Sequence, residues 1–417
     1  MSTMPVVIAF LLSTMVALLF TQGSFSRRVT LFCRGAANET ILLMVLIFVL
    51  AGAFAGTANA MGAVDATVTM ALKFLPHTMI PASLFIAACF VSMSMGTSCG
   101  TIAALTPVAV GIAPQIGMDL PAMLGIVVGG AMFGDNLSFI SDTTIVVTRT
   151  QGVEMRDKFK VNLRLVLPMA ILCTFIYVYQ GYRLEGELFT ASVSWIKIVP
   201  YLTVLIAALA GMNVILVLML GTALAGIIGL ATGDLGLLEW AKTANAGIVG
   251  DMGELIIVSF MAGGLFELVR VNGGIVWLVE KLASKVKSQR KAESRIALLT
   301  ILTNLCTANN TIALLIVGNI ARNVGKTVNL SGKRTASLLD TLSCFTQSLL
   351  PYGAQLLIAT SLAHNVSPTE VIPYLFYPML LGVAVILSII FRYPKDNHSS
   401  QALPSDSSPL IPHPDSN

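Results

Sequence analysis

An apolar segment, residues 122–149, is interrupted by the run Gly134-Asp135-Asn136-Leu137-Ser138-Phe139-Ile140-Ser141-Asp142-Thr143-Thr144. A charge at the centre of a bilayer costs about 2.5–3.5 kcal/mol on insertion scales, so two aspartates in such a segment indicate a function. Irregular backbone at membrane depth is tolerated only where it is buried in protein or lines a cavity. We therefore expect a broken membrane helix whose break lies at a binding site.

The composition supports a membrane protein. Hydrophobic residues make up 55% of the 417 residues and charged residues 11%, whereas a soluble protein carries roughly 25% charged residues. The formal net charge of +4 is too small to indicate nucleic-acid binding, and the four histidines and six cysteines show no metal-ligand spacing. We therefore expect no nucleic-acid partner, no cofactor and no resident metal, with Na⁺ only as a transported ion.

Two kinds of apolar segment alternate along the chain. Runs long enough for simple spans lie near residues 4–21, 40–58, 165–181, 195–210, 213–231, 254–270 and 371–391. Residues 79–150 and 296–362 instead hold short apolar pieces separated by polar clusters, glycines and prolines, which is typical of re-entrant or interrupted helices. We predict an all-α integral membrane protein with about 9–11 spans and two hairpins.

The two interrupted stretches resemble each other. The pattern T-x-x-x-T-I-A begins at Thr97 and again at Thr307, an offset of 210. Further on, Asp135-Asn136-Leu137-Ser138 is matched by Asp340-Thr341-Leu342-Ser343 at an offset of 205, which pairs Asp142 with Gln347. Two motifs in the same order with nearly the same gap predict an internal repeat.

The basic residues predict that the two halves have opposite orientations. Cytoplasmic loops carry the excess of Lys and Arg. Residues 60–80 hold only Lys73 and residues 149–164 hold five basic residues, including Lys158; residues 270–295 hold seven and residues 351–370 hold none. An inverted repeat of this kind is a common plan of secondary transporters. Each half would contain a hairpin, with tips near 96–101 and 307–311, followed by a broken helix.

This interpretation divides the chain into five parts. We expect N-terminal membrane helices in residues 1–60, a first repeat in 61–181, connecting helices in 182–252, an inverted second repeat in 253–393 and a disordered tail in 394–417. Proline and serine dominate that tail, with few apolar residues. The loop charges place the C-terminus in the cytoplasm, and we expect the protein in the cytoplasmic (inner) membrane.

Hydroxyls and amides surround the membrane aspartates in both halves. Such oxygen atoms suit a hard cation such as Na⁺, and a buried carboxylate can alternatively hold a proton. The candidate ligands of a cation, a proton or a substrate are Asp135, Asp142, Asn136, Ser138, Ser141, Thr143, Thr97, Ser98, Thr101, Asn309, Asn310, Thr311, Asp340, Ser343, Thr346 and Gln347.

The polar motifs of the first half resemble the NhaC-type Na⁺/H⁺ antiporter family of the larger ion transporter superfamily. The family pattern is G-T-S-W-G-T followed by G-D-K-[ML]-S-P-[LI]-S-D-T-T, and this chain matches it most closely within residues 96–148. Cys99 stands where Trp is usual, Asn136 where Lys is usual and Phe139 where Pro is usual. The resemblance implies inverted repeats, hairpins, broken helices and Na⁺/H⁺ antiport by a divergent member.

Two other functions stay open at this point. A Na⁺- or H⁺-coupled transporter or exchanger of an amino acid or organic anion would bind a substrate carboxylate at the N–H groups of the hairpin tips. An intramembrane aspartyl protease would need G-x-G-D, and Met132-Phe133-Gly134-Asp135 lacks the first glycine, so we expect no enzyme. The expected partners are the lipid bilayer and a small ion or small-molecule substrate, and the sequence leaves a homodimer open.

Overall fold

The computed structural model describes residues 6–139, 141–184, 194–274 and 288–394, and these residues form helices with no strand. The predicted tail beyond Pro394 and the basic residues Lys281, Lys285 and Lys287 lie outside the described residues. The helices are α1 (Val6–Phe20), α2 (Phe25–Ala36), α3 (Glu39–Ala60), α4 (Ala63–Phe74), α5 (Ile80–Met95), α6 (Ser98–Ile112), α7 (Leu120–Leu137), α8 (Asp142–Gln151), α9 (Met155–Tyr182), α10 (Trp195–Leu209), α11 (Val214–Thr232), α12 (Leu237–Ala246), α13 (Gly253–Val271), α15 (Gln289–Thr307), α16 (Asn310–Thr327), α17 (Gly332–Leu349), α18 (Ala354–Ala363), α19 (Pro368–Val371) and α20 (Phe376–Phe391).

Three of the long apolar helices, Ile41–Ala60, Met155–Tyr182 and Val214–Thr232, overlap predicted spans, whereas Ser98–Ile116 and Leu120–Gln151 lie in the stretch for which short pieces are predicted. Among the described residues, five helices are long and apolar enough to cross a membrane, or up to seven if each bent pair is one span. Three shorter apolar helices, within α1, α5 and α10, accompany them. The all-α membrane class with broken helices is confirmed. One boundary differs, because α9 begins at Met155 rather than near residue 165.

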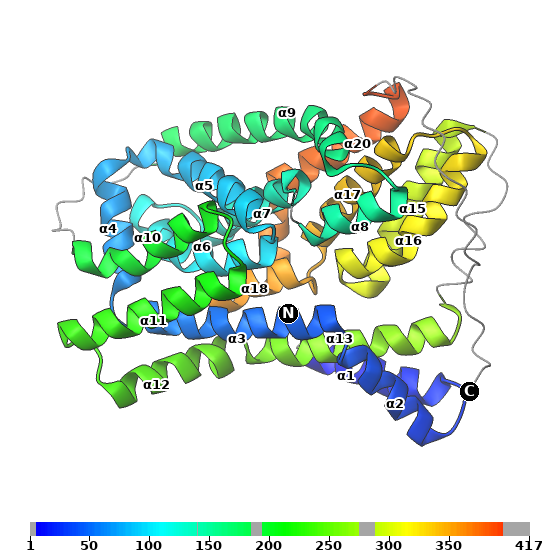
Figure 1. The fold of residues 1–417 in the computed structure, drawn as a ribbon. Coiled ribbons are helices and arrows are strands. Elements are labelled where there is room, and N and C mark those ends of the chain that lie inside the picture. The colour runs from blue at the N-terminus through cyan, green and yellow to red at the C-terminus, as the bar shows by residue number, and fades with distance from the viewer. Residues whose placement is uncertain (1–5, 140, 185–193, 275–287, 395–417) are drawn as a thin grey trace.

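Each half of the protein contains a helical hairpin followed by a broken helix (Figure 1). The hairpins are α5–α6 and α15–α16, and the broken helices are α7–α8 and α17–α18. The two broken helices have the same construction: α7 and α17 each have 18 residues, and α8 and α18 each have 10.

The hairpin tips set the register between the halves. Gly96 and Ala308 end the first helix of each hairpin in the left-handed region, with φ 70° and φ 51°. Thr97 and Asn309 then cap the second helix, because their side-chain oxygens accept hydrogen bonds from the backbone three residues later. Both pairs are offset by 212 residues, as are the residues at which α7 and α17 end. The predicted offsets of 210 and 205 are therefore wrong, and Asp135 corresponds to Gln347.

The same register appears where each hairpin packs on its broken helix. Ser92 Oγ donates to the carbonyl of Ala131 at 2.6 Å, and Asn304 Nδ2 donates to the carbonyl of Ser343 at 2.9 Å. Both pairs are again offset by 212. In each half, a buried polar side chain thus binds the hairpin to the segment that carries the site.

Close packing of α5 on α7 depends on Gly134. A Cβ there would overlap Ser92 and lie 2.6 Å from the backbone nitrogen of Met93. We expect Gly134→Ala to destabilise the protein by about 1–3 kcal/mol, because the buried helix pair cannot separate without losing other contacts. Gly253→Ala is the matched control, since its Cβ would meet nothing within 4 Å. Thermal unfolding in detergent should show a loss for Gly134→Ala alone; equal stability of both variants would contradict this packing role.

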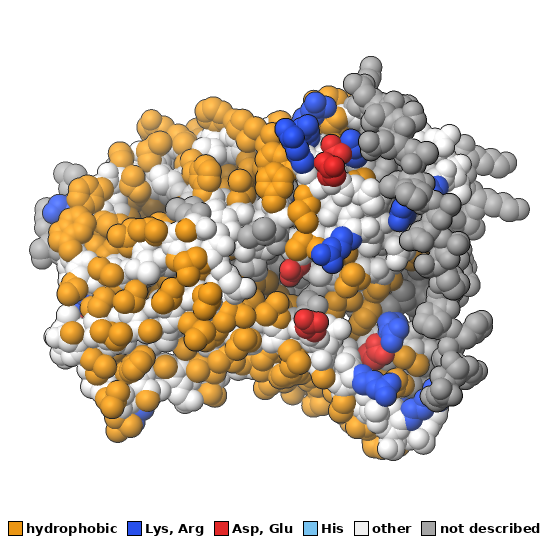
Figure 2. All heavy atoms as spheres, in the orientation of Figure 1, with side chains coloured by type: hydrophobic (Ala, Val, Ile, Leu, Met, Phe, Trp, Pro, Cys, Tyr) orange, Lys and Arg blue, Asp and Glu red, His pale blue; other side chains and the backbone are white. Residues whose placement is uncertain are grey.

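Charged side chains lie mostly in the right half of the view, the half that contains α2, α8, α15 and α16, whereas apolar side chains cover most of the left half (Figure 1 and Figure 2). Two basic residues, on α9 and α17, are an exception because they are buried. Lys158 and Arg334 are buried in ion pairs with Asp340 and Glu293, at 2.8 and 2.9 Å. Lys158, counted above among the basic residues of the loop 149–164, therefore lies on a helix face that packs inward and not in a loop.

Candidate functional site

The two halves meet around a small cavity of about 60 Å³. Both hairpin tips, the break in the first broken helix, the end of α17 and the start of α18 contribute to its walls, and α3 closes one side. Its lining consists of Leu43, Met44, Ile47, Gly96, Thr97, Ser98, Cys99, Asp135, Ser141, Asp142, Thr143, Asn309, Asn310, Thr311, Gln347, Ala354 and Gln355. We call it the central cavity.

A chain of hydrogen bonds connects the two repeats along this cavity. The backbone N–H of Ser98 donates to Asp135 Oδ1 at 3.1 Å. Gln355 Nε2 donates to Ser98 Oγ at 3.1 Å, and Gln347 Nε2 donates to Gln355 Oε1 at 2.9 Å and to the carbonyl of Ala308 at 3.1 Å. Asp135 and Gln347 thus contact the two hairpin tips from equivalent positions. The first half has a carboxylate at this position, and the second half has a neutral amide.

The charges around the central cavity are negative. Asp135 lies in the last turn of α7 and is 4% exposed, and Asp142 opens α8 and is exposed. A helix C-terminus carries partial negative charge, so the end of α7 adds to the attraction for a cation. Among the described residues, no Lys or Arg lines the cavity. The N-termini of α6, α8 and α16 also reach the lining and carry partial positive charge, so the cavity combines two acidic side chains with helix ends of both signs.

Ten of the sixteen predicted ligands line the central cavity, and six do not. The six that do not are Thr101, Asn136, Ser138, Asp340, Ser343 and Thr346. Four of these use side-chain groups on nearby backbone carbonyls: Thr101, Ser343 and Thr346 within their own helices, and Ser138 on Met93. Such bonds use the hydroxyl hydrogens and fix these side chains to the backbone.

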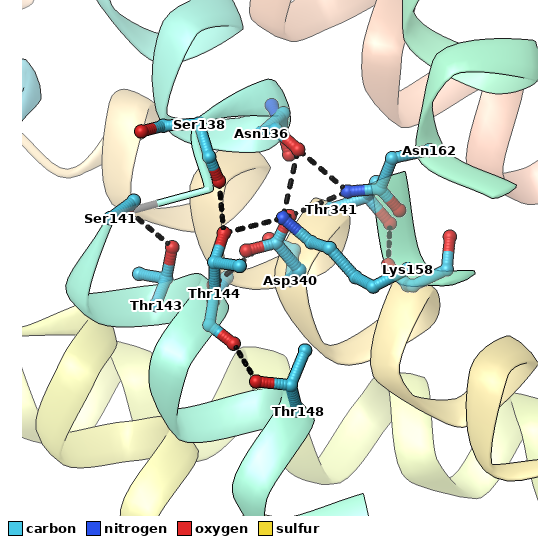
Figure 3. A network of polar contacts seen from close by, with 12 residues as sticks. Asn136, Ser138, Ser141, Thr143, Thr144, Thr148, Lys158, Asn162, Asp340 and Thr341 are labelled. Atoms are coloured by element: carbon cyan, nitrogen blue, oxygen red, sulfur yellow. Dashed lines mark hydrogen bonds and ion pairs between the residues drawn. The ribbon is translucent and has the colours of Figure 1, made fainter. Parts of the chain in front are cut away.

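Asp340 and Asn136 belong to a second polar cluster, beside the cavity (Figure 3). Lys158 reaches from α9 and places its Nζ 2.8 Å from Asp340 Oδ2. The same amine donates to the carbonyl of Asn136 at 2.8 Å and to Thr144 Oγ1 at 2.7 Å. Asn162 Nδ2 donates to Asp340 Oδ2 at 2.7 Å and to the Asn136 carbonyl at 2.9 Å. We call these five residues the lysine cluster.

Sequence reasoning missed Lys158, Asn162 and Gln355. A signal for the first two existed, since positions 158 and 162 are four residues apart and share one helix face with the buried Leu165 and Val166. Gln355 stands alone in an apolar stretch after Pro351, and its position opposite Ser98 follows only from the fold.

A wider hollow reaches the second hairpin tip. It has a volume of about 420 Å³ and is lined by residues of α1, α13 and the α17–α18 break, including Tyr352. A narrower cavity of about 30 Å³ shares Thr307 and Ala308 with this hollow and shares Met44 and Asn309 with the central cavity. The hollow and the central cavity are therefore neighbours, separated by the hairpin tip and α3.

Comparison with known proteins gives consistent matches over most of the chain. The sequence model of the Na⁺/H⁺ antiporter family matches residues 2–182 and 184–394. The chain is 23% identical to the malate-2H⁺/Na⁺-lactate antiporter of Bacillus subtilis strain 168, over 84% of this chain and 80% of that protein. It is also 23% identical to the Na⁺/H⁺ antiporter NhaC of the same organism, over 86% and 84%. The structure of the Alcanivorax borkumensis YdaH transporter aligns with a TM-score of 0.48 at 14% identity, over 94% of this chain and 99% of that one.

Proposed function

Since this chain belongs to the Na⁺/H⁺ antiporter family, we propose that it is a secondary transporter, not an enzyme, and that it exchanges Na⁺ for H⁺. We further propose that it lies in the cytoplasmic (inner) membrane, and the loop charges favour a C-terminus on the cytoplasmic side.

The observation that carries this proposal is the composition of the central cavity. Two carboxylates and several hydroxyl and amide oxygens line it, together with no Lys or Arg among the described residues. Oxygen ligands of this kind suit a hard cation. Its volume of about 60 Å³ is far below the roughly 300–1,000 Å³ of pockets for organic ligands. A small cation therefore fits the site better than an organic anion does.

Exchange follows from competition at two carboxylates. Asp135 and Asp142 bind Na⁺ when ionised and release it when they take up protons, so the site carries one or the other across the membrane. The hairpin-tip residues Ser98, Asn309 and Asn310 supply neutral oxygen ligands from both halves. The wide hollow beside the second tip is the route by which the ion reaches the site from one side.

A Na⁺ pulse on proteoliposomes tests the proposal. The purified protein is reconstituted in vesicles with an imposed pH gradient, acidic inside, reported by a pH-sensitive dye. We expect NaCl to dissipate the gradient, because each entering Na⁺ drives protons out. Choline chloride at the same concentration is the control for ionic strength, and a Na⁺/H⁺ ionophore is the positive control. Equal responses to Na⁺ and choline, in vesicles that respond to the ionophore, would reject Na⁺/H⁺ exchange.

A second candidate is cation-coupled exchange of an organic anion. The similarity to the malate-2H⁺/Na⁺-lactate antiporter favours it, whereas the absence of Lys and Arg from the described cavity lining opposes it. The same vesicles distinguish the two. Dissipation of the gradient that requires malate or lactate inside or outside the vesicles would replace the first proposal by the second.

A further inference from the structure

The lysine cluster lies outside the central cavity and has its own chemistry. Lys158 is 1% exposed and Asp340 is fully buried. The ammonium has three N–H donors, and its three near partners are Asp340, the Asn136 carbonyl and Thr144. Taking an amine and a carboxylate out of water is costly even when they pair, so the position of this charge is a specific feature of the fold.

The partners of the Lys158 amine form the kind of ligand set that a hard cation takes. They are one carboxylate, one backbone carbonyl and one hydroxyl, all oxygen atoms at 2.7–2.8 Å. Three more buried oxygens of the cluster, Asp340 Oδ1, Asn162 Oδ1 and Asn136 Oδ1, accept no hydrogen bond within the described part of the chain. Rotation of the Asn162 amide would turn its oxygen toward the same centre.

The cluster also joins the two repeats. The Asn136 carbonyl lies at the end of α7, Thr144 lies in the first turn of α8, Lys158 lies on α9, and Asp340 lies on α17 of the second half (Figure 3). A carbonyl at a helix C-terminus lacks its helical partner and attracts positive charge. A cation at this point therefore stabilises the end of α7 and links it to the second half through Asp340.

We propose that the lysine cluster is a second cation site whose occupant is the tethered ammonium of Lys158. The covalent cation fills the site permanently, pairs with Asp340 and leaves the central cavity as the place where a free cation binds. When the amine is removed, the remaining oxygens take up Na⁺. This inference concerns cation binding and holds whether or not the protein exchanges Na⁺ for H⁺.

Two substitutions of Lys158 test the proposal: both remove the amine, and only one of them leaves its space empty. Lys158→Ala empties the space between the ligands, whereas Lys158→Met removes the charge and fills the space. The purified variants are heated in detergent in NaCl or in choline chloride at equal ionic strength. Because a ligand of the folded state raises the unfolding temperature, we expect Na⁺ to raise it by several degrees more in Lys158→Ala than in the wild type. The additional rise should be absent in Lys158→Met and in Lys158→Ala/Asp340→Asn.

The unfolding experiment measures only Na⁺ binding, so its result is independent of the result of the transport assay. A Na⁺ response of Lys158→Ala that is no larger than that of the wild type or of Lys158→Met would overturn the proposal. Lys158→Ser, which adds a hydroxyl ligand, provides a second variant and should respond as Lys158→Ala does. Failure of both variants to fold in NaCl would also count against the proposal, since Na⁺ should replace the missing amine.

Discussion

Asp135→Asn is expected to abolish Na⁺/H⁺ exchange while leaving the fold intact. An amide cannot take up a proton, so the variant loses the proton carried by the buried carboxylate, and the exposed Asp142 is the carboxylate that remains in the cavity lining. A hydrogen bond or contact to a charged group contributes about 1.5–3 kcal/mol, so loss of the carboxylate should also weaken Na⁺ binding about 10- to 100-fold. The initial rate of gradient dissipation after a Na⁺ pulse should fall to that of protein-free vesicles.

The fold should tolerate this change for a reason visible in the second repeat. The amide oxygen of the substituted side chain could still accept the N–H of Ser98, which now donates to Asp135 Oδ1 at 3.1 Å. Gln347 occupies the equivalent position in the other half and is itself a neutral amide. Asp65→Asn is the matched control, because Asp65 is an exposed aspartate on α4, away from the cavity. Undiminished exchange by Asp135→Asn would remove Asp135 from the site.

Asp142→Asn should have a smaller effect than Asp135→Asn. Asp142 is exposed at the start of α8, where water screens its charge and the helix N-terminus already favours a negative group. We expect a raised Na⁺ concentration for half-maximal rate, with exchange retained at saturating Na⁺. Comparison of the two variants therefore distinguishes the role of the buried Asp135 from that of the exposed Asp142.

The hairpins and broken helices were predictable because polar and glycine-rich interruptions of apolar helices are visible in one sequence. The residue-by-residue correspondence between the two repeats was not predictable, because it was inferred from positions with identical residue types. A helix N-cap accepts Thr or Asn almost equally, so Thr97 corresponds to Asn309 rather than to Thr307. In the broken helix, the match of Asp135 to Asp340 missed the true partner by seven residues, or two helical turns. That shift keeps the same helix face, which explains why Asp340 is buried near the site without lining it.

The partner of Asp340 could not be found from loop charges alone. Arg156, Lys158, Lys160 and Arg164 follow one another on the first turns of α9, and a rule that counts basic residues treats them alike. The inward face of the helix decides which one is buried. Asn136 stands where Lys is usual in the family pattern, and its backbone carbonyl accepts a hydrogen bond from Lys158. The amine in this region therefore comes from α9 and pairs with Asp340, while Asp135 and Asp142 are the acidic residues in the lining of the central cavity.

The Lys158–Asp340 pair should behave as a buried ion pair whose halves cannot be removed singly. In Na⁺-free choline buffer, we expect Lys158→Met and Asp340→Asn each to cost about 3–5 kcal/mol, because each leaves an uncompensated charge away from water. The double variant should recover most of that loss, since it buries two neutral groups of similar size. A double-mutant cycle from unfolding in detergent measures the coupling.

An exposed ion pair is the control for this double-mutant cycle. Lys333 and Asp157 also join the two halves, at 2.8 Å, but their side chains are 41% and 27% exposed. Water screens such a pair, so Lys333→Met and Asp157→Asn should each cost less than about 1 kcal/mol, with little coupling. If the buried pair cost no more than the exposed one, the contact between Lys158 and Asp340 would not act as a buried ion pair.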